Sequence, residues 1–70
     1  MLTTKVFEDS TAYMFSVTDG TEDNTFEYKW GKTPPEGQNL TTYLKNCKRE
    51  AELLAQLEIN KKAPLQEIQL

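Results

Sequence analysis

The sequence predicts an α+β domain in which a three-stranded antiparallel meander (β-β-β) is covered on one face by a single long C-terminal α-helix, followed by a short extended tail. Two observations support this fold class. Phe26, Tyr28 and Trp30 alternate with the charged Glu27 and Lys29, which is the pattern of a strand with one buried face. After a loop rich in glycine and proline, apolar residues recur at helical spacing, which indicates one amphipathic helix.

The second hairpin has a register that the sequence itself favours. Residues that face each other in an antiparallel pair alternate in side, so a correct register must place apolar residues together on one face. With residues 20–23 as the loop, three apolar pairs share a face: Val17–Phe26, Phe15–Tyr28 and Tyr13–Trp30. A tighter turn at Asp19-Gly20 would oppose Val17 with Glu22, so we reject it.

The first hairpin is predicted with Asp9-Ser10 at its tip, which places Phe7 opposite Ala12 on the outer face. The expected inner-face pairs are Leu2–Val17, Thr4–Phe15 and Val6–Tyr13. The three strands then cover residues 2–8, 11–18 and 25–30, and their common inner face needs a cover. The apolar residues predicted on that face are Leu2, Val6, Tyr13, Phe15, Val17, Phe26, Tyr28 and Trp30.

The cover is the helix, which we expect at residues 39–59 with Asn39 as its N-cap. Residues 33–36, which precede it, can form a tight turn or a capping box, and Pro64 prevents its long continuation. The residues expected on its buried side are Leu40, Tyr43, Leu44, Cys47, Ala51, Leu54 and Ala55. A chain of 70 residues supports only one core, so residues 1–59 form a single β-β-β-α domain and residues 60–70 form a tail.

Three sets of apolar residues are left over as candidate partner-binding residues. Leu53 and Leu57 point away from the core side of the helix. They also lie near its end, where the helix should extend beyond the shorter strands by about two turns. Phe7 and Met14 point to the outer face of the sheet, and Leu65 and Ile68 lie in the tail. Either the tail folds back over one of these patches and completes a monomer, or the patches bind a protein partner or a second copy in a homodimer.

The composition argues against an enzyme. The chain has no histidine, so the commonest general base and metal ligand is missing, and Cys47 falls on the core side of the helix. The three glycines are isolated and form no phosphate-binding loop. The acidic run at residues 19–24 does not have the spacing of a calcium-binding loop. We therefore expect no catalytic residues, no cofactor and no metal.

Cysteine usage and hydropathy predict the compartment. Cys47 is the only cysteine, which excludes an internal disulfide and suits a reducing environment. The first residues contain no apolar secretory segment, and no apolar run approaches the ~20 residues needed to span a bilayer. We expect a cytoplasmic protein that has no membrane partner.

The leading functional prediction is a small non-enzymatic protein-interaction module. Compact acidic chains without histidine are common among accessory proteins of phages and other mobile elements, so we associate the chain with that group. The alternative is a nucleic-acid-binding domain that uses the outer sheet face, with Lys5 and Lys29. In element order alone the chain resembles the DNA-binding domains of some integrases and of AP2-type plant regulators, although it has none of their motifs. A net charge of −3 and Glu27 on that face argue against nucleic acid.

Overall fold

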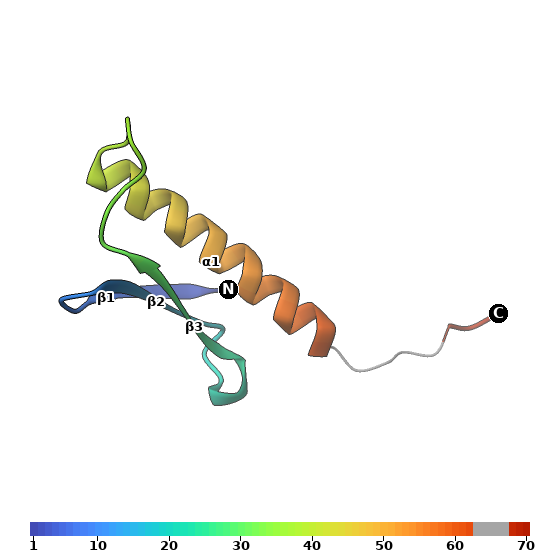
Figure 1. The fold of residues 1–70 in the computed structure, drawn as a ribbon. Coiled ribbons are helices and arrows are strands. Elements are labelled where there is room, and N and C mark those ends of the chain that lie inside the picture. Colours follow the sequence, from blue (N-terminus) through green and yellow to red (C-terminus); the bar gives the residue numbers. More distant parts are fainter. Residues whose placement is uncertain (63–67) are drawn as a thin grey trace.

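The computed structural model describes residues 1–62 and 68–70, and it confirms the predicted fold class. Strands β1 (Thr3–Glu8), β2 (Ala12–Thr18) and β3 (Thr25–Gly31) form one antiparallel sheet in the order β1-β2-β3. A short 3₁₀ turn, η1 (Glu22–Asn24), lies between β2 and β3. Helix α1 (Leu40–Lys62) follows β3 and lies across one face of the sheet (Figure 1).

The register between β2 and β3 is the predicted one. Val17 faces Phe26, and the aromatic pairs follow along the same two strands. The connecting loop is organised by Asp19, whose Oδ1 accepts hydrogen bonds from the Thr21 amide (2.9 Å) and hydroxyl (2.6 Å). Its Oδ2 accepts a third from Asn24 Nδ2 (2.8 Å). These bonds favour the ionised carboxylate, so the pKa of Asp19 lies below its usual value.

The register between β1 and β2 differs from the prediction by two residues. Val6 faces Phe15 rather than Tyr13, and Phe7 faces Met14 rather than Ala12. The reason is the turn, because Asp9 Oδ1 accepts hydrogen bonds from the Thr11 and Ala12 amides (2.7 and 2.8 Å). Ser10 and Thr11 are therefore the tip, and the strands begin to pair at Asp9 and Ala12. A shift of two residues leaves every side chain on its predicted face.

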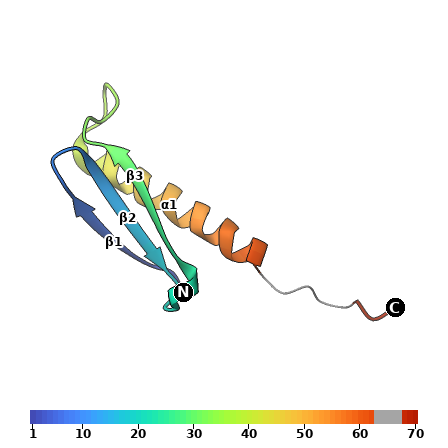
Figure 2. The same ribbon diagram turned by 60° about the horizontal axis from the view of Figure 1, so that its bottom comes forward.

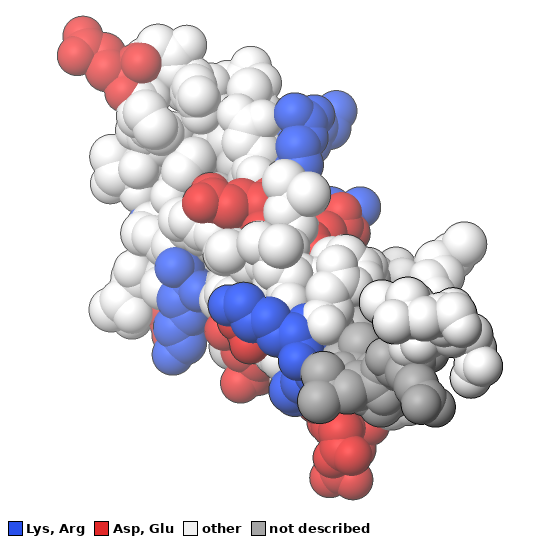
Figure 3. Space-filling view, turned by 90° about the vertical axis from the view of Figure 1, so that its right-hand side faces the viewer, with Lys and Arg blue, Asp and Glu red and all other residues white. Residues whose placement is uncertain are grey.

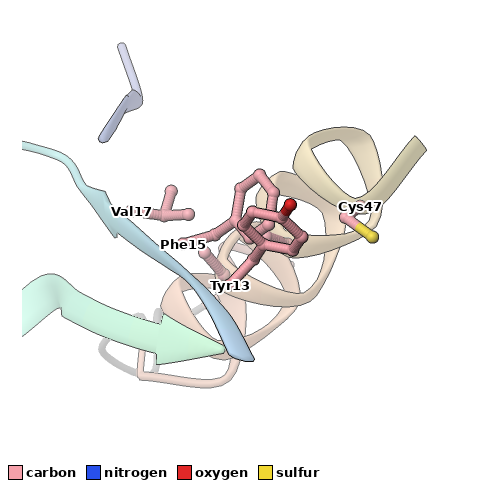
Figure 4. Close-up of a cluster of buried hydrophobic side chains, with 6 residues drawn as sticks. Tyr13, Phe15, Val17 and Cys47 are labelled. Atoms are coloured by element: carbon pink, nitrogen blue, oxygen red, sulfur yellow. The ribbon is translucent and has the colours of Figure 1, made fainter. Parts of the chain in front are cut away.

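The core lies between β2 and α1. Tyr13, Phe15 and Val17 point from β2 toward the helix (Figure 4). The helix meets them with three buried small residues, Cys47, Ala51 and Ala55. Small side chains let the helix backbone approach the sheet closely, so the rings of the strands supply most of the core volume. The edge of the Trp30 ring meets Phe15 in a T-shaped contact, with the ring centroids 5.3 Å apart.

The helix covers two strands rather than three. It packs on β2 and β3 (Figure 2), whereas Val6 on the inner face of β1 remains 48% exposed and is not the core residue predicted. A helix about 10 Å wide can cover two strands that lie ~4.8 Å apart, and little more. The contact that ties β1 to α1 is polar, since the Thr4 hydroxyl donates a hydrogen bond to Glu52 Oε2 (2.6 Å).

The helix begins as predicted and ends later. Asn39 is the N-cap, because its Oδ1 accepts a hydrogen bond from the Thr42 amide (2.8 Å). The preceding turn closes two residues later than expected, through a hydrogen bond from the Gln38 amide to the Pro35 carbonyl (3.1 Å). At the other end α1 continues to Lys62, so residues 60–62 belong to the helix and not to the tail.

Candidate protein-interaction surfaces

The predicted partner-binding residues lie on separate surfaces of the molecule. Phe7 and Met14 lie on the outer face of the sheet, and Leu53 and Leu57 lie on α1, which covers the inner face. Ile68 is 79% exposed, so this part of the tail does not cover either patch. Leu65 lies outside the described residues.

The observed register of β1 and β2 brings the two predicted outer-face residues together. Phe7 and Met14 are direct cross-strand neighbours and line a hollow of about 130 Å³. The rest of its lining is Glu8, Asp9, Ala12 and Lys29. Sites for small organic ligands usually measure about 300–1,000 Å³, so this hollow is large enough for only one apolar side chain.

Charges of both signs surround this hollow. Hydrogen bonds from the Thr11 and Ala12 amides hold the pKa of Asp9 below its usual value, and Lys29 adds a smaller effect in the same direction. On the same face, Lys5 and Glu27 lie in one cross-strand row. The ion pair of Lys32 with Glu8 (3.1 Å) is on the other side of the sheet, because Lys32 lies over the Tyr13 ring, 4.3 Å from its centroid. The outer face therefore has no single sign of charge.

Three neighbouring exposed leucines on α1, Leu53, Leu54 and Leu57, form a leucine patch. Their exposed fractions are 61%, 37% and 55%. Leu54 was predicted to lie in the core, but the buried side of the helix follows Cys47, Ala51 and Ala55, and Leu54 lies beside that line. It is half exposed because the sheet contacts the helix along this narrow line of small residues.

These leucines are exposed because of the side of the helix they occupy, and the predicted overhang is not the cause. The last helical residue, Lys62, still reaches the β2–β3 loop, where its Nζ donates a hydrogen bond to the Asp23 carbonyl (2.8 Å). The same Nζ lies 4.8 Å from the centroid of the Phe26 ring. The end of α1 therefore remains in contact with the β2–β3 hairpin through the side chain of Lys62.

Two charged residues continue the line of the patch. Glu50, Leu54, Leu57 and Lys61 follow one another at spacings of four, three and four residues, which places them on one stripe of a helix. We call these four residues the seam. Tyr43 precedes Glu50 by seven residues, and its hydroxyl donates a hydrogen bond to the Gly31 carbonyl of β3 (2.8 Å). The seam therefore lies on the β3 side of α1.

The sequence prediction missed three of the four seam residues. Glu50 and Lys61 were not singled out, and Leu54 was assigned to the core. The spacing of four, three and four residues is visible in the sequence and could have identified them. It was not decisive by itself, because only the structure shows that Cys47, Ala51 and Ala55 define the buried side.

The thiol of Cys47 is part of the hydrophobic core. It is buried against the sheet, and this burial raises its pKa, which disfavours the reactive thiolate. Within residues 1–62 and 68–70, no group of three or more cysteine and acidic side chains is arranged to hold a metal ion.

Comparisons with known proteins give no match: no protein family model matches the chain, no curated protein matches its sequence, and no solved structure matches its fold. In the described part of the chain, no helix combines the length and the apolar character needed to cross a bilayer.

Proposed function

We propose that this chain is a small non-enzymatic protein-interaction module that docks through the leucine patch of α1. The observation that carries the proposal is the exposure of Leu53, Leu54 and Leu57 together on a helix whose neighbouring side, Cys47, Ala51 and Ala55, is buried against the sheet. Burying a leucine completely is worth about 1.5–3 kcal/mol, so covering these half-exposed side chains provides a substantial part of a binding energy. Contiguous apolar patches of this kind typically mark interaction sites.

The hollow between Phe7 and Met14 is a second contact point on the opposite face. It accepts one side chain and has no continuous apolar surroundings, since Glu8, Asp9 and Lys29 line it. We assign the larger share of binding to the leucine patch, because hydrophobic binding energy grows with apolar area.

The charge distribution supports a protein partner over the alternative, nucleic acid. Lys5 lies in the same cross-strand row as Glu27, and Lys32 is already paired with Glu8. Acidic and basic side chains also alternate over the face in Figure 3. A nucleic-acid surface needs a concentration of basic groups, which a net charge of −3 does not favour. The lone reduced cysteine suits a module of the cytoplasm.

The experiment is a quantitative pull-down from the native host with three baits. Leu57→Asp places a charge in the leucine patch, and Gln56→Asp places the same charge one residue away, about 100° around α1 and outside the patch. We expect at least one protein, or the chain itself, to be captured by the wild type and by Gln56→Asp but lost with Leu57→Asp. Equal capture by all three folded baits would show that the leucine patch is not the docking surface.

A further inference from the structure

The seam on α1 is complementary to a reversed copy of itself. Its outer positions are an acid at one end, Glu50, and a base at the other, Lys61, with Leu54 and Leu57 between them. Spacings of four, three and four residues are those of the contact line between two helices of a coiled coil. If two copies of α1 pair along this line, each seam residue of one copy faces one of the same four residues of the other copy.

We infer that the partner of this surface is a second copy of the chain, bound with the two α1 helices antiparallel. This inference rests on the proposed docking function of the leucine patch. With the helices antiparallel, Leu54 of each copy faces Leu57 of the other, and Glu50 of each copy faces Lys61 of the other. All four layers of the seam are then matched, two by apolar contacts and two by opposite charges.

Other pairings of the same helices are worse. A parallel pair also brings leucine onto leucine, but it places Glu50 against Glu50 and Lys61 against Lys61. Shifting the antiparallel pair by one turn places a leucine against Glu50 or Lys61. Charge therefore selects both the direction and the register, as it does at the flanking positions of natural coiled coils.

The two charged groups can form these contacts. Both are exposed, and within residues 1–62 and 68–70 Glu50 forms no ion pair. In the part of the chain that the structure describes, Lys61 is paired with Glu58, at 3.6 Å on the same helix, and this contact between exposed groups is weak. Both groups can therefore reach a second copy without breaking a strong interaction.

The geometry leaves space for a second helix. The seam lies on the β3 side of α1, and β3 is an edge strand, so no further strand of residues 1–62 and 68–70 follows on that side. The half-buried Tyr28 and Trp30 on β3 add apolar surface beside the seam. A contact of four layers, two of them apolar, is small, so we expect a reversible dimer with a dissociation constant of roughly 10–100 µM.

Sedimentation equilibrium of charge-reversed chains tests this pairing. Over about 10–500 µM, a range chosen to bracket that constant, the wild type should approach twice the monomer mass. Glu50→Lys and Lys61→Glu should each weaken self-association at least about tenfold, because like charges then meet twice in every dimer. An equimolar mixture of the two variants should recover it, since each acid again faces a base. Lys45→Glu, a charge reversal on another side of α1, is the control and should behave as the wild type.

Three results would overturn the inference: a wild type that stays monomeric at about 500 µM, single variants that associate as strongly as the wild type, or a mixture no better than either variant alone. Circular dichroism of each variant confirms that its fold is intact. A strictly monomeric wild type that still captures a different protein through the leucine patch would refute the self-pairing and leave the proposed function in place. A wild type that neither self-associates nor captures another protein through the leucine patch would refute the self-pairing and the proposed function together.

Discussion

At the scale of single residues, the small side chains of α1 determine how closely the helix approaches the sheet. Ala51 and Ala55 are fully buried against the rings of β2, which leaves no room for larger groups. We expect Ala51→Leu to lower the free energy of unfolding by about 1–3 kcal/mol through overpacking. Urea unfolding measures this change. Gln56→Leu places a leucine on the exposed side of α1 and should have little effect, and equal losses in the two variants would contradict the packing argument.

Asp9 is the residue that fixes the first turn, and its effect depends on pH. Its hydrogen bonds to Thr11 and Ala12 lower its pKa in the folded chain relative to the ordinary value of 3.8. A lowered pKa means that the ionised carboxylate stabilises the fold above about pH 3.8, and that this contribution is lost as the pH falls through the folded pKa.

Asp9→Asn should therefore melt at a lower temperature than the wild type at neutral pH, and the difference should shrink as the solution is acidified below about pH 3.8. Thermal unfolding followed by circular dichroism at several pH values measures this. Glu36→Gln is the control, since among the described residues the Glu36 side chain forms no hydrogen bond. A pH-independent difference for Asp9→Asn would show that the carboxylate charge does not hold the turn.

At the scale of elements, the two hairpins show what a sequence pattern can and cannot determine. The second hairpin was predictable because three aromatic or aliphatic pairs agree on one register. A slip of two residues in either direction would oppose Val17 with Asn24 or Tyr13 with Lys32. The first hairpin has fewer apolar residues on β1, so its pattern allows registers two residues apart. Only the hydrogen bonds of Asp9 decide between them, and these are not visible as a periodicity.

The end of α1 was mispredicted for a related reason. Residues 60–62 are polar and carry no helical pattern, yet Lys62 contacts both the Asp23 carbonyl and the Phe26 ring. These partners lie almost forty positions away in the chain, so the contact follows from the tertiary fold. We expect Lys62→Ala to lower the free energy of unfolding by about 0.5–1 kcal/mol, the usual worth of an exposed cation–π contact.

Urea unfolding of Lys62→Ala beside Lys61→Ala isolates this contact. Among the described residues Lys61 pairs with Glu58 on its own helix, and because this exposed pair is weak, its removal costs little in the monomer. A Lys62→Ala variant no less stable than Lys61→Ala would mean that the last turn of the helix is not anchored to the sheet.

At the scale of the whole molecule, the candidate site was only partly predictable. Leu53 and Leu57 could be identified because they lie off the apolar stripe of the helix. The exposure of Leu54 and of Val6 could not, because it depends on the helix covering two strands and not three. Sequence periodicity shows which residues share a side of a helix or strand, whereas the number of strands that the helix covers decides how many of them are buried.

Self-pairing through the seam links association to stability. A folded chain that dimerises is stabilised by mass action, and a dissociation constant of tens of micromolar adds roughly 1 kcal/mol at several hundred micromolar protein. For a domain of this size that corresponds to an increase of about 4–8 °C in the melting temperature. We expect the wild type to show this increase between about 10 and 500 µM, and Leu57→Asp to melt at one temperature throughout the range. Differential scanning calorimetry at several concentrations measures both melting temperatures. A wild-type melting temperature that does not depend on concentration would contradict stabilisation by self-association.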